Sequence, residues 1–351
     1  MNTATILFFL SSGLFLGWSL GANDAANIFG TAVGSRMIKF TSAAIICSIF
    51  VIIGAVFSGS GAAHTLGKLG AINTLGGAFT VAFTSAVTVF SMTKLSLPVS
   101  TSQAIVGGII GWNLFSGKTT EPTVFSKIVG TWILCPILAF VFSFIIYLIT
   151  RNILKKVKIH LLKLDFYTRL GLVIVGAFGS YSLGANNIAN VMGVFVPSAP
   201  FKDIQLGHFF MFSGTQQLFL LGGLAIAVGI FTYSKKVMMT VGSGIFKLSP
   251  ITALIVILSS SLVLFLFASK GLHNWFVSVG IPPIPLVPVS SSQAVVGAVI
   301  GIGLAKGGRN VNYKMLFKIS AGWVATPVIA AIICFIALYI MQNVFQILVF
   351  I

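Results

Sequence analysis

The chain of 351 residues is 57% hydrophobic and only 7% charged, with a formal net charge of +17 and a mean hydropathy of +1.07. Soluble globular domains carry about a quarter charged residues, so this composition excludes that class. Apolar runs of about 20 residues, long enough to cross a bilayer, recur along the sequence and do not alternate as the strands of a β-barrel do. We therefore expect an all-α polytopic membrane protein.

Ten candidate spans are expected, at residues 4–33, 42–60, 71–93, 97–116, 124–150, 169–196, 204–231, 250–268, 281–305 and 316–349. The segments 97–116 and 281–305 are rich in glycine and polar clusters and begin at or beside a proline, so each is expected to be a broken or re-entrant helix. The connection from Arg151 to Arg169 carries six basic residues, and the positive-inside bias puts it in the cytoplasm. Sixteen Lys and Arg residues then lie on the cytoplasmic side and five outside, which predicts that both termini face outward.

The distribution of positive charge also bears on partners and location. The basic residues lie in short loops, and no domain is present that could offer a groove to nucleic acid. The expected partner is the lipid bilayer, and the expected location is the cell membrane (plasma or inner), crossed many times. A homo-oligomer is compatible with the sequence but is not predicted by it.

Two motifs occur once in each half of the chain. Gly21–Asn27 (Gly-Ala-Asn-Asp-Ala-Ala-Asn) returns 163 residues later as Gly184–Asn190, and Pro98–Gly107 returns 190 residues later as Pro288–Gly297. Five spans precede the basic connection and five follow it, so the halves start on opposite sides of the membrane. This arrangement predicts two inverted-topology repeats, which place substrate near the midplane at their interface. The first repeat is 1–150, the cytoplasmic connection 151–168 and the second repeat 169–351.

The proline-containing motifs are expected to start helices at an anion site. Proline suits the first helical turn, and Ser or Thr caps the free N–H groups. A helix N-terminus attracts an anion without Lys or Arg, and two such ends would hold a tetrahedral oxyanion from both sides. Gly107 and Gly297 are expected to allow close helix approach. The candidate anion-binding residues are Ser100, Thr101, Ser102, Gln103, Ser290, Ser291, Ser292 and Gln293.

The Gly-Ala-Asn motifs suit a cation. Asp24 is one of four acidic residues and the only one within a long hydrophobic run, where a carboxylate costs several kcal/mol unless it is paired or wet. Gly21 and Gly184 are expected to unwind their helices and free carbonyl oxygens for Na⁺. Alternatively Asp24 carries a proton; the residues alone do not decide between Na⁺ and H⁺ as the coupling ion, and no other cofactor is expected. The candidate cation-binding residues are Asn23, Asp24, Asn27, Asn186, Asn187 and Asn190, with Na⁺ assigned to Asp24, Asn27 and Asn190.

Several other polar residues have a structural interpretation. A single Asn or Ser in a membrane helix is often a hydrogen bond between helices, but four repeated motifs in order favour a binding site. Packing and kink residues are expected at Trp132, Pro136, Trp323 and Pro327, and interfacial residues at His64, His160, His208 and His273.

On these motifs the sequence resembles the PiT family of inorganic phosphate transporters, also called the Pho4 family. The resemblance covers nearly the whole chain and implies an inverted-repeat transporter with outward termini that moves phosphate with Na⁺ or H⁺ and binds both through the motif residues. The chain departs from the family pattern at three places. Asn187 replaces the usual Asp, Gln103 and Gln293 replace the usual His, and the connection between the halves is short.

The leading prediction is therefore a phosphate–cation symporter rather than an enzyme. Sulfate is the alternative substrate, because hydrogen phosphate can donate its proton to a carboxylate whereas sulfate only accepts, and Asn187 removes one carboxylate. An anion channel is a weaker alternative. An enzyme is disfavoured because the spans hold one carboxylate, and no histidine lies near Ser100 or Ser290 in sequence.

Overall fold

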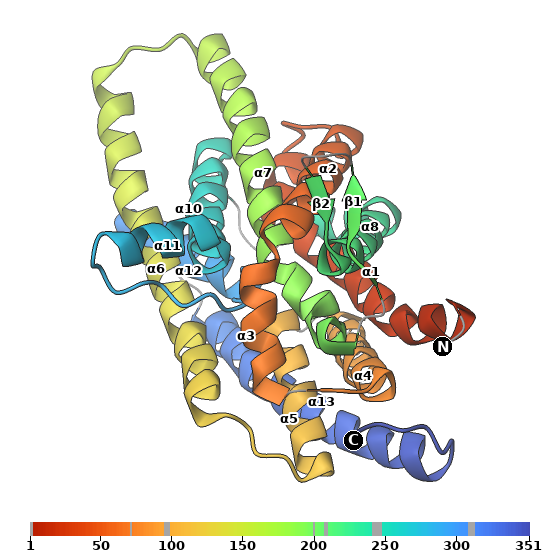
Figure 1. Cartoon of the computed structure of the whole chain (residues 1–351). Coiled ribbons are helices and arrows are strands. Elements are labelled where there is room, and N and C mark those ends of the chain that lie inside the picture. Colours follow the sequence, from red (N-terminus) through yellow and green to blue (C-terminus); the bar gives the residue numbers. More distant parts are fainter. Residues whose placement is uncertain are drawn as a thin grey trace.

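The computed structural model describes residues 3–70, 72–94, 99–198, 201–206, 210–240, 248–307 and 313–351. In these residues the chain forms helices, apart from one short antiparallel hairpin (Figure 1). The elements are α1 (Thr3–Gly34), α2 (Phe40–Ser58), α3 (Ser60–Gly70), α4 (Leu75–Lys94), α5 (Thr101–Ser116), α6 (Pro122–Lys156), α7 (Leu161–Met192), the 3₁₀ helix η1 (Gly193–Ser198), β1 (Ile204–Leu206), β2 (Phe210–Phe212), α8 (Gly214–Thr232), α9 (Ser234–Thr240), α10 (Pro250–Ala268), α11 (Lys270–Ser278), α12 (Ser291–Ala305) and α13 (Tyr313–Asn343).

Among the described residues, seven helices are long and apolar enough to cross a membrane, namely α1, α2, α4, α6, α8, α10 and α13. The outer faces of α6 and α13 expose large apolar side chains, with Ile133 65% and Ile332 56% accessible. Side chains of this kind are stable at such exposure when lipid rather than water surrounds them. The chain is an all-α polytopic membrane protein, as its composition predicts.

The other three expected spans correspond to α5, α7 and α12. Helices α5 and α12 have 16 and 15 residues, fewer than the about 20 that cross a bilayer, and 281–290 before α12 is not helical. This agrees with the expectation of broken helices in 97–116 and 281–305. The expected span 204–231 is wrong in its first part. There the chain forms the hairpin β1–β2, and α8 starts only at Gly214, where Ser213 and Gln216 form a capping box.

Helices of the two halves of the chain pack against each other in equivalent pairs. Helix α1 packs on α8, and its counterpart α7 packs on α2; likewise α5 packs on α13, and its counterpart α12 packs on α6. Each helix that carries a motif therefore lies against a helix from the other half. This is the contact pattern expected of two repeats related by a two-fold axis.

Glycines bring these helix pairs close at equivalent positions. A Cβ on Gly107 would lie 2.2 Å from the carbonyl oxygen of Pro327, and a Cβ on Gly297 would lie 2.2 Å from that of Pro136. Only glycine allows this backbone approach, so the predicted role of both glycines and the packing role of both prolines are confirmed.

The glycines of the Gly-Ala-Asn motifs have the same role. A Cβ on Gly21 would lie 2.0 Å from the carbonyl oxygen of Ile226, and a Cβ on Gly184 would lie 2.1 Å from that of Val51. Both α1 and α7 run unbroken through these glycines. The expectation that the helices unwind there is therefore wrong, because the missing side chain lets a neighbouring helix approach instead.

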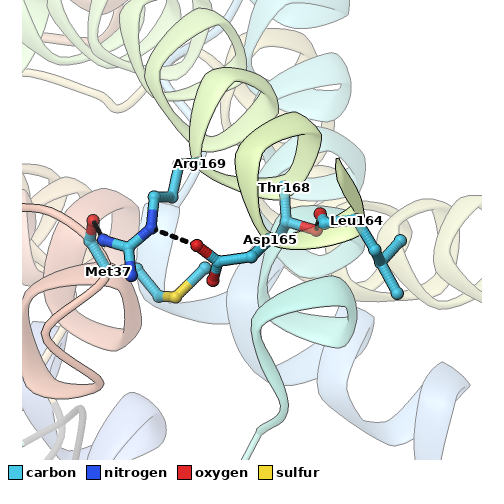
Figure 2. A network of polar contacts seen from close by, with 5 residues as sticks. All are labelled: Met37, Leu164, Asp165, Thr168 and Arg169. Carbon is cyan, nitrogen blue, oxygen red and sulfur yellow. Dashed lines mark hydrogen bonds and ion pairs between the residues drawn. The ribbon is translucent and has the colours of Figure 1, made fainter. Parts of the chain in front are cut away.

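The connection between α6 and α7 lies at one end of the molecule, and both ends of the chain lie toward the other (Figure 1). Figure 2 shows how the start of α7 is held there: the Arg169 guanidinium pairs with Asp165 (2.8 Å) and donates to the carbonyl oxygen of Met37 (2.6 Å). The Arg169–Asp165 pair is nearly half exposed, so it contributes at most about 1 kcal/mol. Its contact with Met37 joins the start of α7 to the turn that follows α1.

Candidate functional site

The starts of α5 and α12 are capped in the same way. The Ser100 hydroxyl accepts from the N–H of Gln103, and the Ser290 hydroxyl accepts from the N–H of Gln293, both at 3.3 Å. The predicted serine caps are therefore confirmed. Pro288 lies two residues before the cap rather than in the first helical turn, so that expectation is wrong, while its counterpart Pro98 lies outside the described residues.

The two helix starts also bind each other. The Ser102 hydroxyl donates to the carbonyl oxygen of Val289 (3.1 Å), and the Ser292 hydroxyl donates to that of Val99 (3.3 Å). These hydrogen bonds are equivalent under the repeat, and all four residues are at or beside a helix N-terminus. The structure thus brings the two predicted anion-binding elements together.

Asp24 lies against the start of α12. Its side chain is 3% exposed and accepts hydrogen bonds from the Ser291 hydroxyl (2.7 Å) and the Asn23 amide (3.0 Å). The Asn27 amide donates to the same Ser291 hydroxyl at 3.3 Å. Among the described residues Asp24 makes no ion pair. An unpaired buried carboxylate costs several kcal/mol, so two neutral donors leave this charge only partly compensated.

The second Gly-Ala-Asn motif lies against the start of α5. The Asn190 amide donates to the Ser102 hydroxyl (2.8 Å) and to the side-chain oxygen of Asn187 (2.9 Å). The remaining Asn187 Nδ2 and Asn190 Oδ1 are buried and have no hydrogen-bond partner among the described residues, and neither has the Thr101 hydroxyl. This side of the site therefore offers unsatisfied donors and acceptors where the first motif has a carboxylate.

The side chain of Asn186 binds the backbone of the segment that leads into α12. Its amide donates to the carbonyl oxygen of Val289 (2.7 Å), and its side-chain oxygen accepts from the N–H of Val289 (3.0 Å). Its counterpart Asn23 instead bonds Asp24, so the two equivalent asparagines have different partners. Both polar atoms of the Asn186 side chain are used in holding the backbone.

Gln103 and Gln293 occupy equivalent positions in the first turns of α5 and α12. Both side chains are 2% exposed, and the oxygen of each has no partner among the described residues. Buried amides are normally satisfied, so these two oxygens are further acceptors available to a ligand at the motifs.

We use the name motif cluster for the described residues of the four motifs, which are Gly21–Asn27, Val99–Gln103, Gly184–Asn190 and Pro288–Gln293. Hydrogen bonds link Asp24, Asn23 and Asn27 to Ser291, and Asn187 and Asn190 to Ser102. The Thr101 hydroxyl and the side-chain oxygens of Gln103 and Gln293 have no partner among the described residues. For the predicted Na⁺ ligands, the structure links Asp24 and Asn27 through Ser291, and it links Asn190 to Ser102 in the other half of the cluster.

Three contributions to the cluster were not predicted. The carbonyl oxygens of Val99 and Val289 tie the helix starts together, and Ser85 on α4 donates to the carbonyl oxygen of Ala104 in α5 (3.2 Å). Every residue has a backbone carbonyl group, so residue type does not predict which carbonyl oxygens make these contacts. Ser85 belongs to no repeated motif. Of the histidines, His64 and His273 belong to none of the four motifs and line a separate cavity, and His208 lies outside the described residues.

A family model described as the phosphate transporter family matches residues 20–170, 162–334 and 284–349, which together cover most of the chain. The chain belongs to this family. The family is one of transporters rather than enzymes, which agrees with the prediction from the motifs.

Individual relatives cover nearly the whole chain. A protein of Methanocaldococcus jannaschii named "Putative phosphate permease" is 32% identical over 92% of this chain and 93% of its own. The sulfate permease CysP of Bacillus subtilis is 28% identical over 96% of this chain and 87% of its own. A solved structure, "The sodium-dependent phosphate transporter", has the same fold, with a TM-score of 0.75 and 23% identity over 96% of this chain and 99% of its own.

Proposed function

We propose that this protein takes up inorganic phosphate by symport with a cation, Na⁺ or H⁺. The observation that carries the proposal is the motif cluster, in which the starts of α5 and α12 meet a buried carboxylate on α1 and a set of asparagines on α7. An anion site and a cation site thus share hydrogen-bonding residues, which is the arrangement that coupled binding requires.

Backbone N–H groups are the proposed ligands of the anion. The first intrahelical hydrogen bonds run from Ala104 to the Ser100 carbonyl (3.0 Å) and from Ala294 to the Ser290 carbonyl (3.1 Å). The N–H groups before them, at Thr101, Ser102, Ser291 and Ser292, belong to the unpaired first turns of two helices. The positive ends of both helix dipoles then favour an anion in a cluster that contains no Lys or Arg.

Asp24 is the proposed ligand of the cation. Its buried charge has no protein cation beside it among the described residues, so binding of Na⁺ or a proton relieves the cost of burying it. Because Ser291 is the first residue of α12 and its hydroxyl binds Asp24, occupancy of the cation site changes the electric field and the hydrogen bonding at the anion site. Asn27 completes the proposed cation site through the same hydroxyl.

Sulfate is the second candidate substrate, and Asn187 is the residue that favours it. Its Nδ2 is a buried donor without a partner among the described residues, at the position equivalent to Asp24. Sulfate only accepts hydrogen bonds, so it suits an amide donor, whereas the proton of hydrogen phosphate needs an acceptor. The similarity to a sulfate permease supports the same alternative.

We further propose that the protein crosses the cell membrane with both termini outside. The basic α6–α7 connection would lie in the cytoplasm, in keeping with the positive-inside bias. In Figure 1 both chain ends lie away from this connection, as the proposed orientation requires.

The proposal is tested by uptake of labelled phosphate and of labelled sulfate into vesicles that contain the purified protein, each with and without a Na⁺ gradient. A symporter accumulates its substrate above equilibrium, and removal of Na⁺ or addition of a protonophore abolishes the accumulation. A channel only equilibrates the anion, and that result would overturn the symport mechanism.

A further inference from the structure

A cavity of about 640 Å³ lies between α3, α6, α11 and the chain that leads into α12. Three lysines and two histidines from three separate helices line it: His64 and Lys68 from α3, Lys127 from α6, and Lys270 and His273 from α11. No Asp or Glu is among its lining residues. The predicted orientation places Lys68, Lys127 and Lys270 on the outer side of the membrane.

Two acidic residues lie near lining residues in the sequence or the fold, but their carboxylates are bound elsewhere. Glu121, which precedes α6, accepts a hydrogen bond from the Thr123 hydroxyl, and Asp203 accepts one from the N–H of Gly214 (2.7 Å). Neither carboxylate lines the cavity. Three positive charges therefore face one hollow, and a concave surface of one sign concentrates the field there and raises the local concentration of anions.

One part of the cavity lining directly precedes the motif cluster in the sequence. This part is the segment 285–287, which is fastened on two sides: the Thr65 hydroxyl donates to the carbonyl oxygen of Leu286 (2.5 Å), and the His273 ring contacts the carbonyl oxygen of Ile284 (2.9 Å). Val287 lines the cavity and is buried, and two residues later the backbone of Val289 is hydrogen-bonded by Asn186. The segment that lines the cavity is thus continuous in sequence with the start of α12, and hydrogen bonds hold it on both sides.

We propose that this basic cavity is a vestibule that binds an inorganic oxyanion on the outer side before it reaches the motif cluster. The proposal rests on the proposed function, since it supplies the anion that the cluster carries. Lys68, Lys127 and Lys270 hold the anion by charge. The phosphate group of a lipid has the same chemistry as free phosphate, so the test separates these two sources.

The test compares the wild type with the triple variant Lys68→Gln, Lys127→Gln, Lys270→Gln and with the three single variants. The side chains are exposed, so the substitutions leave the helix packing intact. Lys202→Gln is the matched control, because Lys202 is an exposed lysine on the same predicted side that does not line the cavity. The KM of phosphate uptake should rise roughly tenfold in the triple variant at low ionic strength with little change in Vmax, and the difference should shrink at high salt. An unchanged KM in the triple variant, or an equal rise in Lys202→Gln, would overturn the vestibule.

Direct binding gives a readout that needs no transport. At saturation with labelled phosphate, the purified wild type should bind one more phosphate per chain than the triple variant, in neutral and in anionic lipid alike. Equal stoichiometry would overturn the proposal, and so would a difference that anionic lipid abolishes, because a lipid headgroup would then be the occupant. If the wild type accumulates neither phosphate nor sulfate but still shows the extra bound phosphate, the proposed transport function fails, while the oxyanion site in the cavity stands.

Discussion

The substitution Asp24→Asn removes the one carboxylate of the motif cluster with the smallest change of shape. The Ser291 hydroxyl can still donate to the remaining side-chain oxygen, while the Asn23 amide loses its acceptor if the new amide faces it. One lost hydrogen bond reduces the free energy of unfolding by about 1 kcal/mol, so we expect the variant to fold and insert.

The effect on cation binding should be much larger. Removing one member of a buried charge pair costs about 3–5 kcal/mol, which corresponds to a loss of cation affinity of about a hundredfold or more. With the cation bound this much more weakly, the cation gradient no longer drives the anion. We therefore expect Asp24→Asn to abolish accumulation against a gradient.

The assay is accumulation of labelled phosphate in vesicles with an inward Na⁺ or proton gradient, normalised to the amount of inserted protein. Asp165→Asn is the matched control, because it makes the same chemical change at a half-exposed carboxylate whose pair with Arg169 is worth at most about 1 kcal/mol (Figure 2). Accumulation at the wild-type level in Asp24→Asn would refute the coupling role of this residue.

Three other substitutions test separate parts of the account. Asn187→Asp should raise the ratio of phosphate to sulfate uptake, because a carboxylate accepts the proton of hydrogen phosphate and repels sulfate; an unchanged ratio would contradict the substrate reasoning. Gly107→Ala should lower stability in a thermal melt by about 1–3 kcal/mol, since its Cβ would lie 2.2 Å from a backbone oxygen. Gly130→Ala meets no atom within 4 Å and should melt no lower than the wild type, so equal melting of both variants would argue against the close helix approach. Asn186→Leu should destabilise the protein by about 1–3 kcal/mol through loss of both hydrogen bonds to Val289, and wild-type melting would show that the start of α12 is held by other contacts.

Much of this architecture could be predicted from the sequence because the repeated motifs preserve residue type. The offsets of 163 and 190 residues identify equivalent positions, and Ser100 and Ser290 indicate where α5 and α12 start. Small residues such as Gly107 and Gly297 mark close contacts, and the structure places both against prolines of the opposite half.

Partners distant in the chain were harder to predict. Ser291 and Asp24 meet from opposite halves of the chain, and no residue pattern specifies which hydroxyl reaches the carboxylate. The roles of Gly21 and Gly184 were also ambiguous, because glycine permits both an unwound helix and a close helix pair; the neighbouring backbones of α8 and α2 decide for the second.

The basic cavity could not be predicted for a related reason. Lys68, Lys127 and Lys270 belong to no motif and lie on three different helices, so only the fold brings them together. In the sequence they are ordinary loop-proximal lysines, and their common orientation toward one hollow is a property of the packing of α3, α6 and α11.

The most direct test of the central claim is whether purified wild-type protein in sealed vesicles concentrates labelled phosphate when an inward Na⁺ or proton gradient is the only energy source. The account predicts that phosphate accumulates above its external concentration and that this accumulation collapses when the gradient is dissipated. Sulfate should compete with phosphate to the extent that it binds at Asn187. If internal phosphate and sulfate merely reach the external concentration whatever cation gradient is applied, the motif cluster does not couple a cation to an oxyanion.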